Sequence, residues 1–231
     1  MKALVIGGTS NVGQDIVKTL STNKYEVNFT YSSNEKKALE LETKYNSISH
    51  KVDIRCEDQV ESLFKNINNL DLLVIVSGVF SLAEQQNLEL TDFNNLIDIN
   101  IKGTFLTVKH AVDSMNEDSS IITISSINAF HPGFGQTAHY DGSKGFILSY
   151  TKSLASELAP KKIRVNSIAP GLIEAEYLHD DSNPVLDMFL ERAVLKKTVK
   201  VEDVSSTVLF LSQNKAIDGQ CIIVDCGYLI G

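Results

Sequence analysis

The sequence predicts a doubly wound α/β fold, in which helices cover both faces of a parallel sheet. Three observations support it. Short apolar runs rich in β-branched residues recur at wide intervals, amphipathic segments separate them, and no linker divides the 231 residues. Strands that are covered on both faces read as continuous apolar runs, as these do.

Six apolar runs have the length of strands, and they occupy residues 3–6, 27–31, 72–76, 121–124, 163–169 and 221–224. The segment HKVDIR (50–55) adds the third strand in chain order, which makes about seven. Amphipathic segments between the strands predict helices over 12–20, 35–45, 57–67, 91–115, 140–158 and 201–212. Because strand and helix alternate, we expect right-handed crossovers.

We expect residues 1–231 to form a single domain, because the chain can bury one large core and contains no Pro/Gly/Ser linker or internal repeat. The least regular portion is 171–200, which includes HDDSNP (179–184). Long irregular segments in compact domains are usually functional, so 171–200 is a candidate substrate loop or lid. A variable surface loop is the alternative.

Composition argues against several classes of function. The formal net charge of −8 and the lack of a basic stripe argue against a nucleic-acid partner. No apolar run approaches the roughly 20 residues that span a bilayer, so we expect no membrane partner. The five histidines show no HExxH-like pairing, and we expect no metal site.

The cysteines and the beginning of the chain bear on its location. MKALVIGG leads directly into a short apolar run, without the longer apolar stretch and cleavage site of a signal peptide. Cys56, Cys221 and Cys226 are an odd number and lack zinc-site spacing. We therefore expect reduced thiols in a cytoplasmic protein.

A glycine-rich turn joins the first strand to the first helix in LVIGGTSNVGQDIV (4–17). Gly7 and Gly13 bracket this turn, and glycine lets the backbone approach a ligand closely. The free N–H groups at the start of the helix suit a pyrophosphate. Rossmann-like folds bind dinucleotides at this place, although the same pattern also occurs as ordinary strand-to-helix punctuation.

The stretch HYDGSKG (139–145) places Tyr140 and Lys144 four residues apart, on one face of a helix. A nearby cation stabilises the phenolate and so lowers the tyrosine pKa from about 10. IITISS (121–126) ends in Ser125 and Ser126 at the carboxyl end of a predicted strand, where parallel sheets bind ligands. A serine there can polarise a carbonyl, although ordinary turn chemistry is the alternative.

These motifs make the chain resemble a classical short-chain dehydrogenase/reductase over essentially its whole length. The similar segments are GGTSNVG (7–13), NIKG (100–103), the SS pair followed by YDGSK, RVNSIAPG (164–171) and GQCIIVDCG (219–227). The resemblance implies an NAD(P)-dependent oxidoreductase that transfers hydride between nicotinamide and a carbonyl or alcohol. A 3-oxoacyl thioester reductase is a candidate. A dinucleotide-binding sensor or scaffold with little or no turnover is the alternative.

The resemblance also implies roles for four catalytic residues. Tyr140 would exchange a proton with the substrate oxygen, which Ser126 would position and polarise. Lys144 would lower the pKa of Tyr140 and bind the nicotinamide ribose, and Asn100 would hold a water in the proton relay. The implied cofactor-binding residues are Gly7, Ser10, Asn11, Val12, Gly13, Ser32, Asp53, Gly78, Tyr140, Lys144, Pro170, Gly171 and Ile173.

Departures from the family pattern concern mainly the support of the cofactor. Ile6 and Ala175 stand where threonine is usual, and Asn11 stands where glycine is usual. IVSG (75–78) keeps only Gly78 of the usual NNAG motif. The spacing from the SS pair to YDGSK is one residue longer than expected, which predicts a small loop insertion.

The end of the second strand bears on the choice of cofactor. TYSSNEKK (30–37) has no acid at positions 31–33, and an acid there would repel a 2′-phosphate, so NADP(H) is slightly favoured over NAD(H). Ser32 can donate a hydrogen bond, and Lys36 or Lys37 can add charge. Asp53 is the candidate for an adenine contact, against helix capping as the alternative.

Related proteins commonly form dimers or tetramers through long helices and the C-terminal segment, so the resemblance implies a homodimer or homotetramer. The apolar ending GYLIG (227–231) suits such an interface, and packing within the chain is the alternative.

Overall fold

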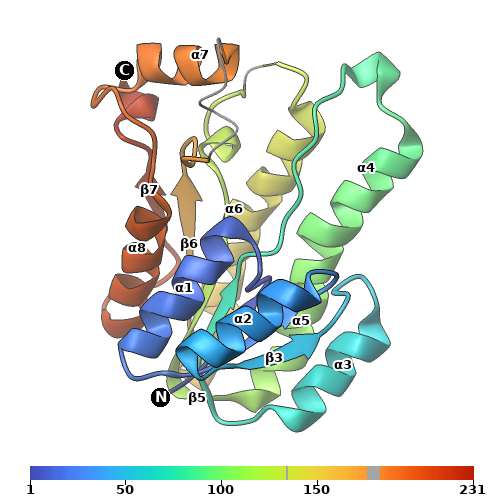
Figure 1. Ribbon diagram of the computed structural model, residues 1–231, viewed down its shortest axis with the longest axis vertical. Coiled ribbons are helices and arrows are strands. Elements are labelled where there is room, and N and C mark those ends of the chain that lie inside the picture. The colour runs from blue at the N-terminus through green and yellow to red at the C-terminus, as the bar shows by residue number, and fades with distance from the viewer. Residues whose placement is uncertain (134, 176–182) are drawn as a thin grey trace.

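The computed structural model describes residues 1–133, 135–175 and 183–231. Seven parallel strands form one sheet in the order β3-β2-β1-β4-β5-β6-β7 (Figure 1). The strands are β1 (Lys2–Ile6), β2 (Glu26–Tyr31), β3 (Ile48–Lys51), β4 (Leu70–Ile75), β5 (Met115–Ile124), β6 (Arg164–Pro170) and β7 (Cys221–Val224). The predicted fold class is confirmed. The strand order reverses between β1 and β4, which is where such sheets bind ligands.

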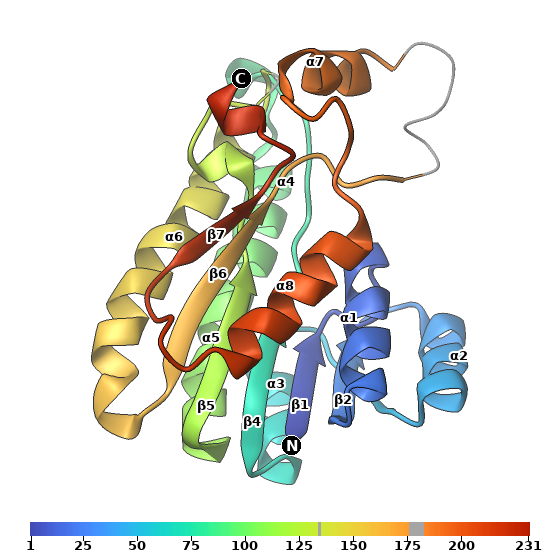
Figure 2. The ribbon, with the colours of Figure 1, turned by 90° about the vertical axis from the view of Figure 1, so that its left-hand side faces the viewer.

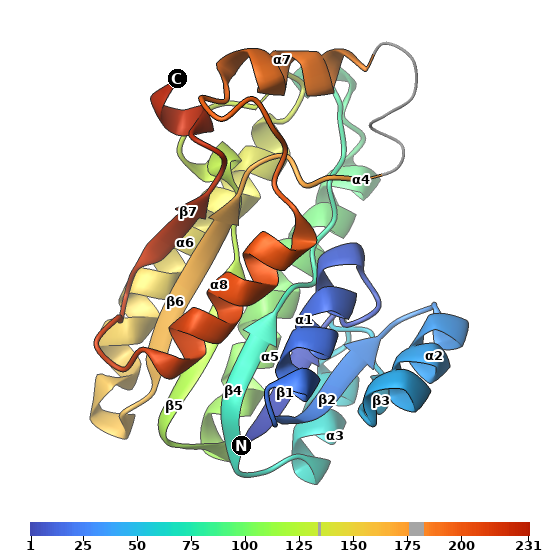
Figure 3. The same ribbon diagram turned by 60° about the vertical axis from the view of Figure 1, so that its left-hand side comes forward.

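Helices cover both faces of the sheet. They are α1 (Asn11–Thr22), α2 (Glu35–Tyr45), α3 (Glu57–Asn66), α4 (Leu90–Ile97), α5 (Thr104–Ala111), α6 (Ala138–Leu158), α7 (Pro184–Arg192) and α8 (Val201–Gln213). The helices α1, α2 and α8 contribute buried residues to the core on one face, and α3, α5 and α6 to the core on the other. Figure 3 shows α1 and α8 lying side by side in front of the sheet.

Alternation of side chains along the strands builds these two cores. Val5 and Phe29 point into the core beneath α1, whereas Leu4 and Ile6 point into the opposite one. All four are at most 1% exposed. Burial on both faces explains why the strands read as unbroken apolar runs.

The helix expected over 91–115 is interrupted. A π-helical turn, Asp98–Gly103, separates α4 from α5, and β5 already begins at Met115. The spacing of apolar residues along a sequence does not reveal a π-helical turn. Such a turn adds one residue without changing which residue types the helix contains. The turn carries Asn100, and it is therefore a feature of the site described below.

The segment 171–200 is more regular than its sequence suggests. Ile173 forms a parallel bridge with Val199, and α7 follows the undescribed residues 176–182, which include Asp180 and Asp181. Figure 2 shows α7 and the C-terminus at the end of the sheet to which the strands point. There Phe189 of α7 is fully buried in a third apolar cluster with Ile127 and Tyr228.

Candidate active site

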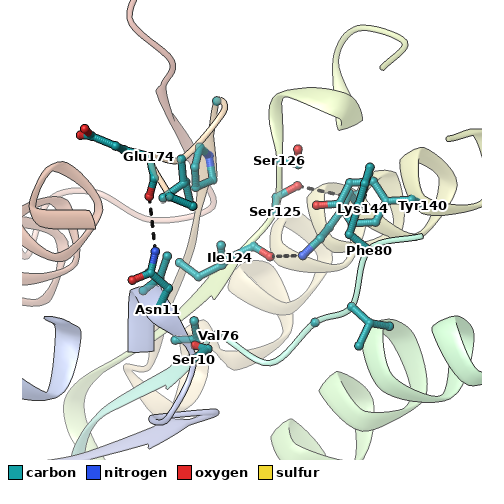
Figure 4. Close-up of a pocket in the computed structure, with 17 residues that line it drawn as sticks. Ser10, Asn11, Val76, Phe80, Ile124, Ser125, Ser126, Tyr140, Lys144 and Glu174 are labelled. Atoms are coloured by element: carbon teal, nitrogen blue, oxygen red, sulfur yellow. Dashed lines mark hydrogen bonds between the residues drawn. The ribbon is translucent and has the colours of Figure 1, made fainter. Parts of the chain in front are cut away.

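A cleft of about 840 Å³ lies at the carboxyl ends of the strands (Figure 4). Its lining comes from the turn after β1, the segments after β4, β5 and β6, and α6. It contains ten of the residues predicted for the site: Ser10, Asn11, Val12, Gly78, Ser126, Tyr140, Lys144, Pro170, Gly171 and Ile173. The lining also includes Val76, Val79, Phe80 and Glu174, which the sequence motifs did not single out.

Ser10 organises the glycine turn as the N-cap of α1. Its hydroxyl accepts a hydrogen bond from the Gly13 N–H, at 3.1 Å, and donates to the Gly7 carbonyl, at 2.8 Å. Gly7 adopts a φ of 86°, which favours glycine. A Cβ on Gly13 would overlap the Gly7 carbonyl oxygen. Gly13 therefore acts through close packing and does not line the cleft.

The first turn of α1 presents backbone donors to the cleft. Asn11 and Val12 line it, and N–H groups in the first turn of a helix have no partner within that helix. The Asn11 side chain donates to the Glu174 carbonyl oxygen at 3.4 Å, across the cleft (Figure 4). This arrangement suits the pyrophosphate of a dinucleotide.

An adjoining cavity of about 320 Å³ contains Gly7, Ser32 and Asp53, together with Arg55. The Arg55 guanidinium grips the Asp53 carboxylate, with Nη2 at 2.7 Å from Oδ2, and holds the pKa of that carboxyl below its usual value. Asp53 does not cap a helix, because α3 begins at Glu57. Arg55 was missed by the motif analysis, and its place two residues after Asp53 is the only signal in the sequence.

Tyr140 and Ser126 both line the cleft, and the Ser126 hydroxyl is near enough to the phenol to affect its pKa. The Phe80 ring stands edge-on to the Tyr140 ring, with centroids 4.9 Å apart. Burial raises the pKa of Tyr140 to about 12, the Ser126 hydroxyl acts to lower it, and the Asp141 carboxylate raises it further. The phenol is therefore protonated at neutral pH.

Lys144 lies behind the tyrosine. Its Nζ donates to the Ile124 carbonyl at 2.9 Å and lies 5.7 Å from the centroid of the Tyr140 ring (Figure 4). Burial lowers the pKa of Lys144 to about 8. The expected net lowering of the Tyr140 pKa beside Lys144 is not found, because burial of the phenol raises that pKa.

The two serines after β5 have different environments. The Ser125 hydroxyl is buried and donates to the Lys144 carbonyl at 3.0 Å, so it holds α6 against the sheet. Both serines line the cleft, but only the Ser126 hydroxyl lies beside the Tyr140 phenol. Of the pair, Ser126 is placed to reach a substrate.

Asn100 is buried outside the cleft lining. Its amide accepts from the Val79 N–H at 2.8 Å and donates to the Val79 carbonyl and to Ser143 Oγ, both at 3.0 Å. Gly78 runs between Asn100 and Lys144, and a Cβ there would lie 3.3 Å from Lys144 Nζ and 3.4 Å from Asn100 Oδ1. The glycine kept from the usual NNAG motif thus gives the loop room to pass the lysine.

A third cavity, of about 530 Å³, shares Ser126 and Tyr140 with the cleft. Its apolar lining includes Phe80, Leu82, Ile127, Leu172, Ile173 and Val185. Three neutral amides, Asn128, Gln136 and Asn183, also line it. A substrate whose carbonyl reached Tyr140 would lay its remaining atoms against this surface.

The described residues contain neither a candidate metal site nor a helix that could cross a membrane. Among residues 1–133, 135–175 and 183–231, no group of three or more His, Cys, Asp or Glu side chains can hold a metal ion. Across those same ranges, no helix is both long and apolar enough to cross a membrane.

Comparison with known proteins assigns the chain to a family. A family model described as enoyl-(acyl carrier protein) reductase matches residues 7–229. The chain is 31% identical to the 3-oxoacyl-[acyl-carrier-protein] reductase FabG of Buchnera aphidicola, over 97% of this chain and 96% of that protein. It is also 31% identical to carbonyl reductase family member 4 of Xenopus laevis, over 96% and 95%.

Solved structures agree. A short-chain dehydrogenase/reductase from Serratia marcescens superposes with a TM-score of 0.92 at 28% identity, over 98% of this chain and 97% of that one. BdcA in complex with NADPH superposes with a TM-score of 0.92 at 25% identity, over 98% and 93%. With the serine, tyrosine and lysine gathered at one cleft, these matches show that the chain belongs to the classical short-chain dehydrogenase/reductase family and is an NAD(P)-dependent oxidoreductase.

Proposed function

We propose that the enzyme reduces the carbonyl group of an apolar, uncharged substrate, with NADPH as the hydride donor. The observation that carries this proposal is the pair of hydroxyls, Ser126 and Tyr140, shared by the cleft and the apolar cavity. The acyl chain of a 3-oxoacyl thioester, the substrate class in the names of several relatives, fits such a cavity.

The chain's own residues account for the proton chemistry. Bound NADPH supplies the hydride. Tyr140 is protonated at neutral pH and gives its proton to the substrate oxygen, while Ser126 donates a hydrogen bond to the same oxygen. The ammonium of Lys144 stabilises the phenolate that remains. Asn100 fixes the loop at Val79, and we assign it the water of the relay that reprotonates Tyr140 through Lys144.

The residues that line the cleft fit a dinucleotide cofactor. Gly7, in the adjoining cavity, and the first turn of α1, including Ser10, Asn11 and Val12, would hold the pyrophosphate. Gly78, Tyr140, Lys144, Pro170, Gly171 and Ile173 would line the nicotinamide half. Asp53 would meet the adenine, and Gly13 would support the turn from behind.

The preference for NADPH rests on the second cavity. Ser32 and Arg55 both line it, and no carboxylate stands at the end of β2. Ser32→Asp should lower kcat/KM for NADPH more than tenfold and favour NADH, since an acid repels the 2′-phosphate and accepts from the ribose hydroxyls. Ser32→Asn is the uncharged control. Equal ratios of NADPH to NADH efficiency in the aspartate variant and the wild type would contradict the assignment.

The reaction itself is tested with purified enzyme, NADH, NADPH and a panel of ketones and 3-oxoacyl thioesters. Tyr140→Phe should abolish turnover and leave the Kd of NADPH within about twofold, because the ring stays and only the proton donor is lost. Equal turnover by the variant and the wild type would refute the role of Tyr140. Binding of the cofactor without any turnover would favour a sensor instead.

We further propose that 171–200 closes over the substrate as a lid of a single domain spanning 1–231, since Leu172, Ile173, Asn183 and Val185 line the apolar cavity.

We also propose a cytoplasmic homodimer or homotetramer. The three free cysteines support the cytoplasmic location. The exposed Leu90, Phe93 and Phe105 along the α4–α5 stretch support the oligomer. Light scattering that showed a monomer would refute the oligomer.

A further inference from the structure

The residue that follows Tyr140 is an aspartate whose carboxylate gathers three donors from the chain after Ser126. Asp141 Oδ1 accepts from Asn128 Nδ2 at 2.7 Å. Asp141 Oδ2 accepts from Thr137 Oγ1 at 3.0 Å and from the Gly133 N–H at 3.1 Å. These bonds join the first turn of α6 to the segment that leaves β5.

The same network reaches the Ser126 hydroxyl through Asn128. The Asn128 N–H donates to Ser126 Oγ at 3.2 Å, and the Ser126 hydroxyl donates to Asn128 Oδ1 over a longer distance of 3.5 Å. A carboxylate only accepts hydrogen bonds, so Asp141 requires the amide NH₂ of Asn128 to face it. The amide oxygen is thereby turned toward the serine.

The side chains of this network pack closely against the backbone at Gly133. A Cβ on Gly133 would overlap the Asn128 amide nitrogen and crowd the Thr137 hydroxyl. Asn128 also lines the apolar cavity beside Ser126 and Tyr140, so its amide is part of the surface that a substrate would touch. The network lies within the stretch that carries the one extra residue predicted between the serine and tyrosine motifs.

We propose that Asp141 is a positioning residue that holds Asn128 and, through the Asn128 N–H, keeps the Ser126 oxygen in place beside the substrate oxygen. This inference rests on the proposed reduction at Ser126 and Tyr140. Simple helix capping does not account for the contacts, because the three donors belong to residues 128, 133 and 137, and only Thr137 adjoins the start of α6.

Asp141→Asn tests the proposal, because it keeps the size of the side chain but offers an NH₂ group where donors converge. We expect kcat to fall between about tenfold and a hundredfold, since small misplacement of a reacting group has effects of this size. The Kd of NADPH should stay within about twofold. Glu157→Gln, an exposed charge change on the same helix, is the control and should leave kcat unchanged.

A double-mutant cycle distinguishes positioning from two separate effects. Asp141→Ala combined with Asn128→Ala should be no slower than the slower single variant, because both act on Ser126 through one path. Losses in kcat that multiply would overturn the proposal. So would wild-type kcat in Asp141→Asn, even if its melting temperature fell.

A crystal structure of Asp141→Asn provides a readout that needs no turnover. We expect the Asn128 amide to rotate and its hydrogen bonds to Ser126 to change. Unchanged geometry at both residues would overturn the positioning role. If the wild type reduced no carbonyl, the proposed function would fail, and this structure would still decide whether Asp141 orients Asn128.

Discussion

Gly13 shows how one missing side chain shapes the cleft. Because a Cβ there would overlap the Gly7 carbonyl oxygen, Gly13→Ala must displace the turn that presents Asn11 and Val12. We expect the Kd of NADPH to rise at least tenfold, measured by fluorescence titration. Gly142→Ala is the matched control, since nothing lies within 4 Å of its Cβ on α6. It should bind NADPH normally and gain up to about 1 kcal/mol of stability.

The Tyr140 and Lys144 pair predicts a pH dependence. Reduction needs the phenol proton, which a pKa of about 12 retains throughout the assay range, and the ammonium, which a pKa of about 8 removes in alkali. We expect kcat/KM for reduction to be level below pH 8 and to fall about tenfold per unit above it. Stopped assays across this range measure the profile.

Lys144→Arg serves as the control for this profile, because arginine stays charged throughout. Its residual activity should lack the alkaline fall. A wild-type profile that stays level to pH 10 would show that the charge of Lys144 is not required.

At the scale of elements, β6 and α8 are joined by a buried cation. Arg164 donates from Nη1 to the Leu211 and Ile217 carbonyls and from Nη2 to the Ser212 carbonyl, each at 3.1 Å. Arg164→Met removes the arginine donor from the Leu211 and Ser212 carbonyls, while the Ile217 carbonyl keeps its bond from Asn166, so it should lower the free energy of unfolding by about 3 kcal/mol in urea titrations. Lys162→Met, which breaks an exposed pair with Glu117, should change it far less.

The π turn between α4 and α5 limits what a pattern can predict at this scale. The sequence predicts a helix over 91–115 that contains a family-like asparagine. The structure has this asparagine, but the helix is divided into α4, the π turn and α5. The hydrogen bonds of Asn100 run to Val79 and Ser143, which are 21 and 43 residues distant in sequence. The spacing of residues within one segment cannot predict hydrogen-bond partners that lie so far away in the sequence.

At the scale of the whole molecule, α7 connects the end of the sheet to the apolar cavity. Phe189 is fully buried, stacks on Tyr228 with centroids 4.9 Å apart, and packs beside Gly171. Phe189→Ala should cost about 3–5 kcal/mol of local stability and raise the KM of the carbonyl substrate several-fold, because α7 carries the wall at Val185.

Steady-state kinetics and limited proteolysis test this effect. The exposed neighbour Met188 provides the control, and Met188→Ala should leave both unchanged. A Phe189→Ala enzyme with the wild-type KM would show that α7 does not shape the substrate site.

Features that depend on residues close together in the chain could be predicted from the sequence. The apolar runs, the glycine turn and the Tyr140–Lys144 spacing predicted the sheet, the cleft and its family. Arg55, Phe80 and Asn128 were not predicted, because each contributes through a contact across the cleft or a cavity wall. The sign of the Tyr140 shift was also missed, since burial is a property of the surroundings.

The sequence by itself therefore determined the fold class, the family and the residue types available for proton transfer, since these follow from periodicity and short motifs. Only the tertiary structure decided that the Ser125 hydroxyl binds the Lys144 carbonyl, that Gly13 packs while Gly78 makes room for Lys144, and that the Asp141 carboxylate reaches Asn128. The physical reason is that burial, cavity shape and hydrogen-bond direction arise from segments far apart in the chain.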